Sequence, residues 1–129
     1  MAATRKASVR VKRAYDAPES GDGYRVLVDR LWPRGVTKEA LRLDGWMKEI
    51  APTPDLRKWF GHDPERWEEF QRRYRRELSE PAQRRLLAEL AERARSGMLT
   101  LVYGARDREH NGALVLRETI VEMAESRAA

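Results

Sequence analysis

The sequence predicts an α/β fold: a mainly parallel sheet of three to four strands with helices packed on it, in a Rossmann-like layering. Short apolar runs bounded by turn residues alternate with longer segments of helical periodicity, which is the pattern of strands separated by helices. Two of these runs, 24–28 and 98–102, are apolar nearly throughout. Strands of that kind are buried on both faces of a parallel sheet.

The strands are expected in three or four places along the chain. Valine alternates with basic residues over 8–15, which indicates a half-exposed strand. The segments 24–28 and 98–102 are the buried strands. Segment 45–50 is a weaker candidate that is equally compatible with a helical turn. It ends at Ala51-Pro52, because the residue before a proline is pushed out of the α region.

Four helices are expected, each framed by start and stop residues. The first follows Thr53-Pro54 and ends at Gly61, and the second follows Asp63-Pro64. The third runs from Pro81 to Gly97, and the last covers about 111–124. The apolar face of the second helix is formed by residues that recur at helical spacing, Trp67, Phe70, Tyr74 and Leu78.

Length and composition predict one domain, residues 1–129, with a core of about 8–126 between short tails. The chain has no cysteine, which excludes disulfides, thiolate chemistry and cysteine-ligated metals. It has no apolar stretch of membrane-spanning length and no signal-peptide pattern, so we expect no membrane partner and a cytoplasmic location. The chain contains neither a phosphate-binding glycine loop nor the serine-hydrolase motif. No cofactor is assigned.

The charge of the chain is carried by arginine. Basic residues number 26, of which 21 are arginine, against 21 acidic residues, and the net charge is +5. Guanidinium groups suit flat anions such as phosphate and carboxylate. The alternative is a bias of genome composition or heat tolerance, in which the interspersed carboxylates pair with the arginines.

Two segments leave strands where ligands collect in parallel sheets, beyond the carboxyl ends. The first, 29–35, places a Trp-Pro pair between two arginines, and the second, 103–111, enters a helix whose N–H groups favour an anion. Together they predict an arginine-lined anion pocket. In the alternative, the arginines pair with nearby carboxylates, the tryptophan is core and the asparagine only caps the helix. The predicted ligand-binding residues are Arg30, Trp32, Arg34, Tyr103, Arg106 and Asn111.

His110 is the candidate general acid or base, oriented by Asp107 or Glu109. The predicted catalytic residues are therefore His110 and Asp107. The alternative is a surface histidine at a helix start. The other histidine, His62, also has a carboxylate beside it, but neither spacing is specific for a metal, and no metal ligand is assigned.

Several strings resemble one known family. Val26 to Gly35 and Leu99 to Asp107, together with Leu56 to Phe60, look like the YeaO-like proteins, small bacterial proteins known as the domain of unknown function number four-eight-eight. The match covers about Val9 to Val121. This resemblance implies the same α/β fold and brings no established activity.

Wider relatives of that family show an Asp-Val-Arg-x-x-Pro-x-Ser pattern at the second strand and a Cys-His-Arg pattern after a late strand. Arg30, Pro33 and Arg34 fit the first pattern, and only His110 matches the second. A thiol-dependent role of those relatives is therefore excluded here. What the resemblance leaves is an arginine and a histidine at two strand ends, which fits an anionic ligand between them.

Three functions follow from these observations. The first is binding of, or catalysis on, a phosphorylated or nucleotide-like anionic small molecule in the arginine-lined pocket. The second is a nucleic-acid-associated module without catalysis, whose affinity would fall steeply with salt. The third is a stable adaptor that self-associates through its amphipathic helices. The first is preferred, because a set of residues at strand ends is a more specific signal of function than a basic charge spread over the whole chain.

Overall fold

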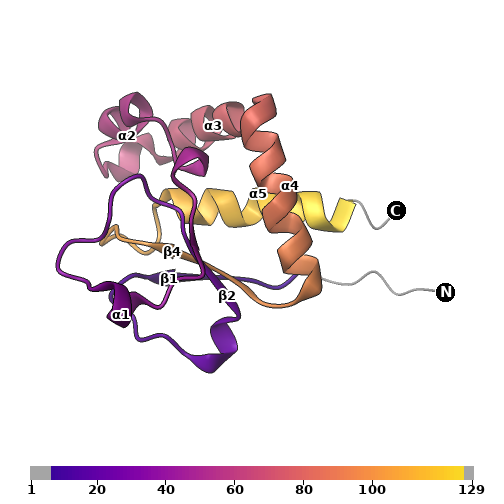
Figure 1. The fold of residues 1–129 in the computed structure, drawn as a ribbon. Helices are drawn as coiled ribbons and strands as arrows, with labels where there is room; N and C mark the ends of the chain where they lie inside the picture. Colours follow the sequence, from indigo (N-terminus) through magenta and orange to yellow (C-terminus); the bar gives the residue numbers. More distant parts are fainter. Residues whose placement is uncertain (1–6, 127–129) are drawn as a thin grey trace.

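Four parallel strands form one sheet in the order β1-β4-β2-β3 (Figure 1). The structure is a computed structural model that describes residues 7–126. Both β1 and β2 pair with β4, so Leu99 lies opposite Val9 on one side and Tyr24 on the other. The strands are β1 (Val9–Arg13), β2 (Tyr24–Leu27), β3 (Gly45–Trp46) and β4 (Leu99–Tyr103).

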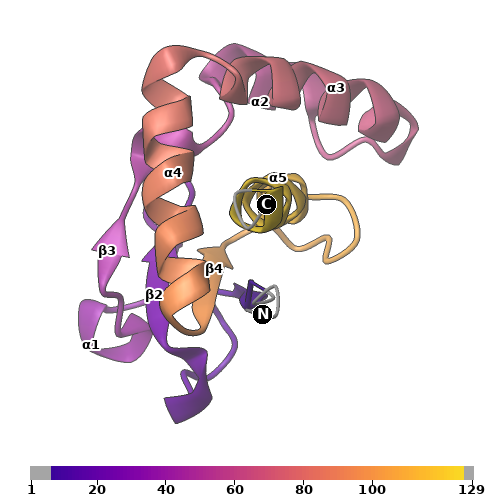
Figure 2. The ribbon, with the colours of Figure 1, turned by 90° about the vertical axis from the view of Figure 1, so that its right-hand side faces the viewer.

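The longer helices pack together beside the sheet. Two of them, α4 (Pro81–Ser96) and α5 (Gly112–Ser126), contact each other and β4, and α5 also contacts β1. Figure 2 looks along α5, with α4 running across it. Next to them lie α2 (Pro54–Phe60) and α3 (Trp67–Leu78). Within residues 7–126, no helix is both long enough and apolar enough to cross a membrane.

The sheet separates two apolar clusters because neighbouring residues of a strand point to opposite faces. Leu101 joins the main core, which contains Phe70 and Leu116 from the helices. Its neighbour Val102 joins a smaller cluster with Leu41 on the other face. Burial of each large side chain contributes roughly 1.5–3 kcal/mol. The main core therefore holds the helices on one face, and the smaller cluster holds the short helix α1 (Lys38–Leu41) on the other.

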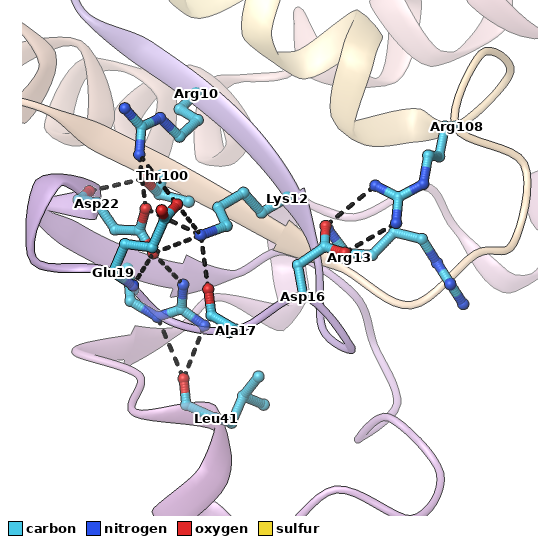
Figure 3. A network of polar contacts seen from close by, with 11 residues as sticks. Arg10, Lys12, Arg13, Asp16, Ala17, Glu19, Asp22, Leu41, Thr100 and Arg108 are labelled. Carbon is cyan, nitrogen blue, oxygen red and sulfur yellow. Dashed lines mark hydrogen bonds and ion pairs between the residues drawn. The ribbon is translucent and has the colours of Figure 1, made fainter.

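A buried ionic cluster lies beside the smaller apolar cluster (Figure 3). Asp22 is fully buried and accepts hydrogen bonds from Arg10, Lys12 and Arg25 at 2.6–3.2 Å. Burial by itself would raise the pKa of Asp22, but the backbone N–H of Glu19 and the three cations outweigh it and lower the pKa to about 2. The cluster joins β1 and β2 across the face that the long helices do not cover.

The structure confirms the predicted α/β class and parallel sheet, and most of the element bounds. Thr53 caps α2 as expected, since its hydroxyl accepts a hydrogen bond from the N–H of Leu56. Segment 45–50 combines both alternatives, because β3 is followed by a turn of 3-10 helix, Lys48–Ile50. The short helix α1 was not predicted. The tails outside residues 7–126 lie beyond the described part of the chain. Further 3-10 turns span Ser20–Asp22 and Pro64–Arg66.

Candidate functional site at the carboxyl ends of β2 and β4

The chain leaves the neighbouring strands β2 and β4 in opposite directions. After β2 it continues to β3, on the side away from β4. After β4 it continues into α5, which packs against β1 on the other side. Connections that diverge from two adjacent parallel strands open a crevice at their carboxyl ends, where ligands of α/β sheets bind. This position is the candidate site of the protein.

Asp29 bridges the two strand ends at this position. Its carboxylate oxygen Oδ2 accepts a hydrogen bond of 2.8 Å from the backbone N–H of Gly104. Its backbone carbonyl accepts a hydrogen bond of 2.6 Å from the indole Nε1 of Trp46. The second carboxylate oxygen, Oδ1, accepts no hydrogen bond from any residue in the range 7–126. The two predicted segments, 29–35 and 103–111, are thus joined through a residue that sequence reasoning did not select.

The surroundings of Asp29 alter its acidity. Burial raises the pKa of its carboxyl above the ordinary value of 3.8. The N–H of Gly104 and the electrostatic effects of Arg57 and His62 act in the opposite direction and offset only part of this effect. Arg57 lies on α2, is exposed and has no ion-pair partner in the described part of the chain. Arg57 therefore acts on the carboxylate of Asp29 through its charge, without an ion pair between them. The available signal in the sequence was an aspartate that directly follows a buried apolar run.

The predicted pair of His110 and Asp107 is formed in the structure. Nδ1 of His110 lies 2.9 Å from Oδ2 of Asp107. The other oxygen of Asp107 accepts hydrogen bonds from the backbone N–H groups of Glu109 and His110. The Glu109 N–H and the imidazole together lower the pKa of Asp107. The imidazole also contacts the edge of Trp67, with ring centroids 5.4 Å apart. Asp107 therefore holds the turn of the loop as well as orienting His110.

Two other predicted residues of this segment are buried. Asn111 caps α5, because its Oδ1 accepts a hydrogen bond from the N–H of Leu114 and its Nδ2 donates to the carbonyl of Asp107. Tyr103 is 4% exposed and belongs to the main core. Burial raises the pKa of the Tyr103 hydroxyl. In this conformation the ring of Tyr103 presents no open face on which a ligand could stack.

Arg30 is directed toward the start of α2. Its Nε donates to the carbonyl of Pro52 at 3.0 Å, and its Nη2 donates to the carbonyl of Ala51 at 3.3 Å. It lines a cavity of about 110 Å³ together with Glu77 and Glu80. Because these neighbours are acidic, the cavity does not suit an anion. The guanidinium of Arg30 holds the loop before α2.

Arg34 and Trp32 lie on other parts of this edge. The carbonyl of Arg34 accepts a hydrogen bond from the hydroxyl of Tyr15. The indole Nε1 of Trp32 donates to the carbonyl of Val36, and its ring packs on the smaller apolar cluster and against Trp46. The two arginines that flank Trp32-Pro33 therefore belong to different neighbourhoods, and the structure does not bring Arg30 and Arg34 together as one anion clamp.

Arg106 is exposed two residues after Gly104. Within the described range it has neither an ion-pair partner nor a side-chain hydrogen bond. Its donors are therefore available to solvent. Of the predicted arginines at strand ends, Arg106 is the one that directly follows the Asp29–Gly104 bridge.

A third segment, after β1, supports the loop and was not predicted. Nε of Arg13 donates to the carbonyl of Ala105 at 2.8 Å. Asp16 forms a two-bond ion pair with Arg108, at 2.8 and 3.0 Å (Figure 3). The hydrogen bonds from Arg108 lower the pKa of Asp16. The loop after β4 is therefore held from the β1 side as well as from the β2 side.

The arginines of α3 are mostly paired with carboxylates. Arg72 and Arg73 bind Glu69, and Arg75 binds Glu122. This face of α3 therefore carries exposed and mostly paired charges. A groove of about 600 Å³ lies beside it, lined by Leu56, Trp59 and charged residues of both signs, and it contains none of the predicted site residues. In residues 7–126 no group of three His, Asp or Glu side chains could hold a metal ion.

Comparison with known proteins identifies the family. The model of the family described as the inactive DUF488-N3 subclade matches residues 8–129. The chain belongs to this family. It is 44% identical to the uncharacterized protein YeaO of Escherichia coli (strain K12) over 111 residues, 86% of this chain and 95% of YeaO. It is 40% identical to the uncharacterized protein Rv3073c of Mycobacterium tuberculosis (strain ATCC 25618 / H37Rv) over 116 residues, 90% of this chain and 96% of that protein. No solved structure matches.

Membership confirms the resemblance to YeaO-like proteins that the sequence strings carry. The relatives are named as uncharacterized, so they supply neither a ligand nor a reaction. The roles of the candidate residues therefore depend on the geometry of this chain.

Proposed function

We propose that the protein binds an anionic, phosphorylated small molecule at the carboxyl ends of β2 and β4 without transforming it. The observation that carries this proposal is that two arginines linked to the Asp29–Gly104 bridge have exposed guanidinium groups. Arg57 acts electrostatically on Asp29, and Arg106 follows Gly104 by two residues. Neither has an ion-pair partner in the range 7–126. Such groups retain their donors for the oxygens of a phosphate.

Two observations favour binding over catalysis. Asp107 uses its two oxygens for the turn of the loop and for His110, so the pair has a structural role that needs no reaction. The family to which the chain belongs is also described as an inactive subclade. His110 and Asp107 are therefore proposed as residues that shape the site, with His110 at its rim.

Isothermal titration calorimetry of the full chain with inorganic phosphate and with AMP tests this proposal. Loss of one charge-assisted hydrogen bond costs about 1.5–3 kcal/mol, so Arg57→Ala and Arg106→Ala should each weaken binding by about 10- to 100-fold. Arg85→Ala, on an exposed position of α4, is the matched control and should leave the affinity unchanged. Equal affinity of all three variants and the wild type would contradict the proposal.

A second titration addresses the nucleic-acid alternative. A short single-stranded oligonucleotide is added at low and high salt, because binding that depends on many phosphates weakens steeply as salt rises. On the proposed function, the oligonucleotide binds no more tightly than AMP at either salt concentration. Tight binding that disappears at high salt would replace the small-molecule proposal with the nucleic-acid module.

A further inference from the structure

Asp29 is a hydrogen-bond acceptor at the carboxyl ends of β2 and β4, where the charge of Arg57 acts on it. Its Oδ2 is occupied by the N–H of Gly104, whereas its Oδ1 has no donor among residues 7–126. The residue is only partly buried, so Oδ1 is not sealed in the core. A solvent-reachable acceptor that has no donor from the protein can exchange its water for a donor group of a ligand, and no hydrogen bond within the protein has to break.

We propose that Asp29 is a ligand-binding residue and that its Oδ1 accepts a hydrogen bond from an N–H or O–H group of the bound molecule. This inference rests on the proposed function and narrows its ligand class. The ligand is a phosphorylated molecule that carries a hydroxyl or amino donor near its phosphate, such as a sugar phosphate or a nucleotide. Inorganic phosphate supplies the anion for Arg57, but its hydroxyl belongs to the same charged group, so it offers Asp29 no separate uncharged donor.

The orientation of Asp29 is set before any ligand arrives. The N–H of Gly104 holds one carboxylate oxygen, and the indole of Trp46 holds the backbone carbonyl of the same residue. A Cβ added at Gly104 would lie 3.4 Å from Oδ2, so the glycine permits this close approach. An acceptor fixed by its own fold loses little conformational entropy when it binds, which increases affinity.

The charges around Asp29 favour a ligand that carries both an anionic group and a hydrogen-bond donor. Arg57 interacts electrostatically with Asp29, and the carboxylate of Asp29 in turn acts on the hydroxyl of Tyr74 of α3. A phosphate near Arg57 is attracted by the guanidinium and repelled by Asp29. A ligand that also donates a hydrogen bond to Asp29 removes part of that repulsion, so the site distinguishes it from a bare anion.

Asp29→Asn is the informative variant because of the fixed N–H of Gly104. The asparagine must direct its carbonyl oxygen to that N–H, since two donors cannot face each other. Its NH2 group then occupies the position of Oδ1 and presents a donor where the wild type presents an acceptor. The variant keeps the bridge between β2 and β4 but reverses the recognition of the ligand.

The experiment is calorimetric titration of the full chain with inorganic phosphate, ribose 5-phosphate and AMP. We expect the wild type to bind at least one of the two organic phosphates about tenfold or more tightly than inorganic phosphate, and Asp29→Asn to abolish that preference. The variant should bind inorganic phosphate as well as or better than the wild type, because a negative charge has been removed. Asp55→Asn, an exposed carboxylate on α2, is the matched control and should retain the preference.

The outcomes separate this inference from the proposed function. Equal binding of the three probes by the wild type, or a preference that survives in Asp29→Asn, overturns the role of Asp29 and leaves phosphate binding intact. Failure of every probe to bind the wild type overturns both. Binding of ribose 5-phosphate as tightly as AMP assigns the donor to a sugar hydroxyl, and binding of AMP alone assigns it to the base.

A measurement on the wild type covers the case in which Asp29→Asn does not fold. In a two-dimensional nitrogen–proton NMR titration with the tighter organic phosphate, the amide of Gly104 and the indole N–H of Trp46 should shift, since both donate to Asp29. Backbone amide signals from the last turn of α4, which leads into the amino end of β4, should stay in place. Unchanged positions of both reporters at saturation would refute the inference.

Discussion

Replacement of Asp22 by asparagine should strongly destabilise the protein. The Asp22 carboxylate is fully buried and neutralises the surrounding side chains of Arg10, Lys12 and Arg25. Its pKa is lowered from 3.8 to about 2, and this difference corresponds to about 2 kcal/mol. The variant also leaves the buried guanidinium of Arg25 without its counter-charge, and breaking a buried pair in this way costs about 3–5 kcal/mol.

The pH dependence gives the assay its internal control. Because the folded-state pKa of Asp22 is depressed, its stabilisation is fully present above about pH 4 and is lost as the pH falls toward 2. Thermal unfolding followed by circular dichroism at pH 7 should therefore show a Tm about 10–20 °C lower in Asp22→Asn than in the wild type. The difference should shrink near pH 2.5, where the wild type has lost part of the same charge.

Asp55→Asn makes the same change of net charge at an exposed position of α2 and should cost less than about 1 kcal/mol. The reasoning would be refuted by an Asp22→Asn variant that stays within 1 kcal/mol of the wild type at pH 7. A loss of equal size at pH 7 and pH 2.5 would also refute it, because the effect would then not come from the carboxylate charge.

Two further predictions concern residues that hold the loop before α2. Arg30→Ala should lower the unfolding free energy by about 1–3 kcal/mol, because it leaves the carbonyls of Ala51 and Pro52 without their donor. Arg34→Ala, whose side chain is exposed, is the control, and an equal loss in both variants would contradict the assignment. In urea denaturation, Tyr74→Phe should lower the unfolding free energy by about 1–2 kcal/mol, because the buried hydroxyl donates to the carbonyl of Ile50. Tyr15→Phe removes an exposed hydrogen bond and should lower it by only about a few tenths of a kcal/mol. Similar losses in the two variants would contradict the role of burial.

The positions of the helices and the buried strands could be predicted because their signals are local. The hydroxyl of Thr53 caps α2 through a residue three positions away, and Gly61 ends the helix with a positive φ of 53°. The apolar run of β4 is recognisable from its own five residues. The helix α1 was missed because its four residues are too few to show a period.

The candidate site was predictable only in part. The sequence indicates that the candidate functional residues follow β2 and β4. The structure joins these two segments through Asp29 and Gly104, which lie 75 residues apart. The sequence does not show which of several arginines faces a ligand. The guanidinium of Arg30 donates to carbonyls that follow it by more than twenty residues. The exposed arginine whose charge acts on Asp29 is Arg57 on α2, outside both predicted segments.

The sequence by itself determined the family, the α/β class and the order of the elements, since these depend on local caps, on the alternation of apolar runs and on strings that recur in relatives. Only the tertiary structure decided which polar groups meet. A carboxylate finds its partners through space, so the buried cluster of Asp22 and the half-occupied carboxylate of Asp29 exist only once the sheet has brought distant segments together.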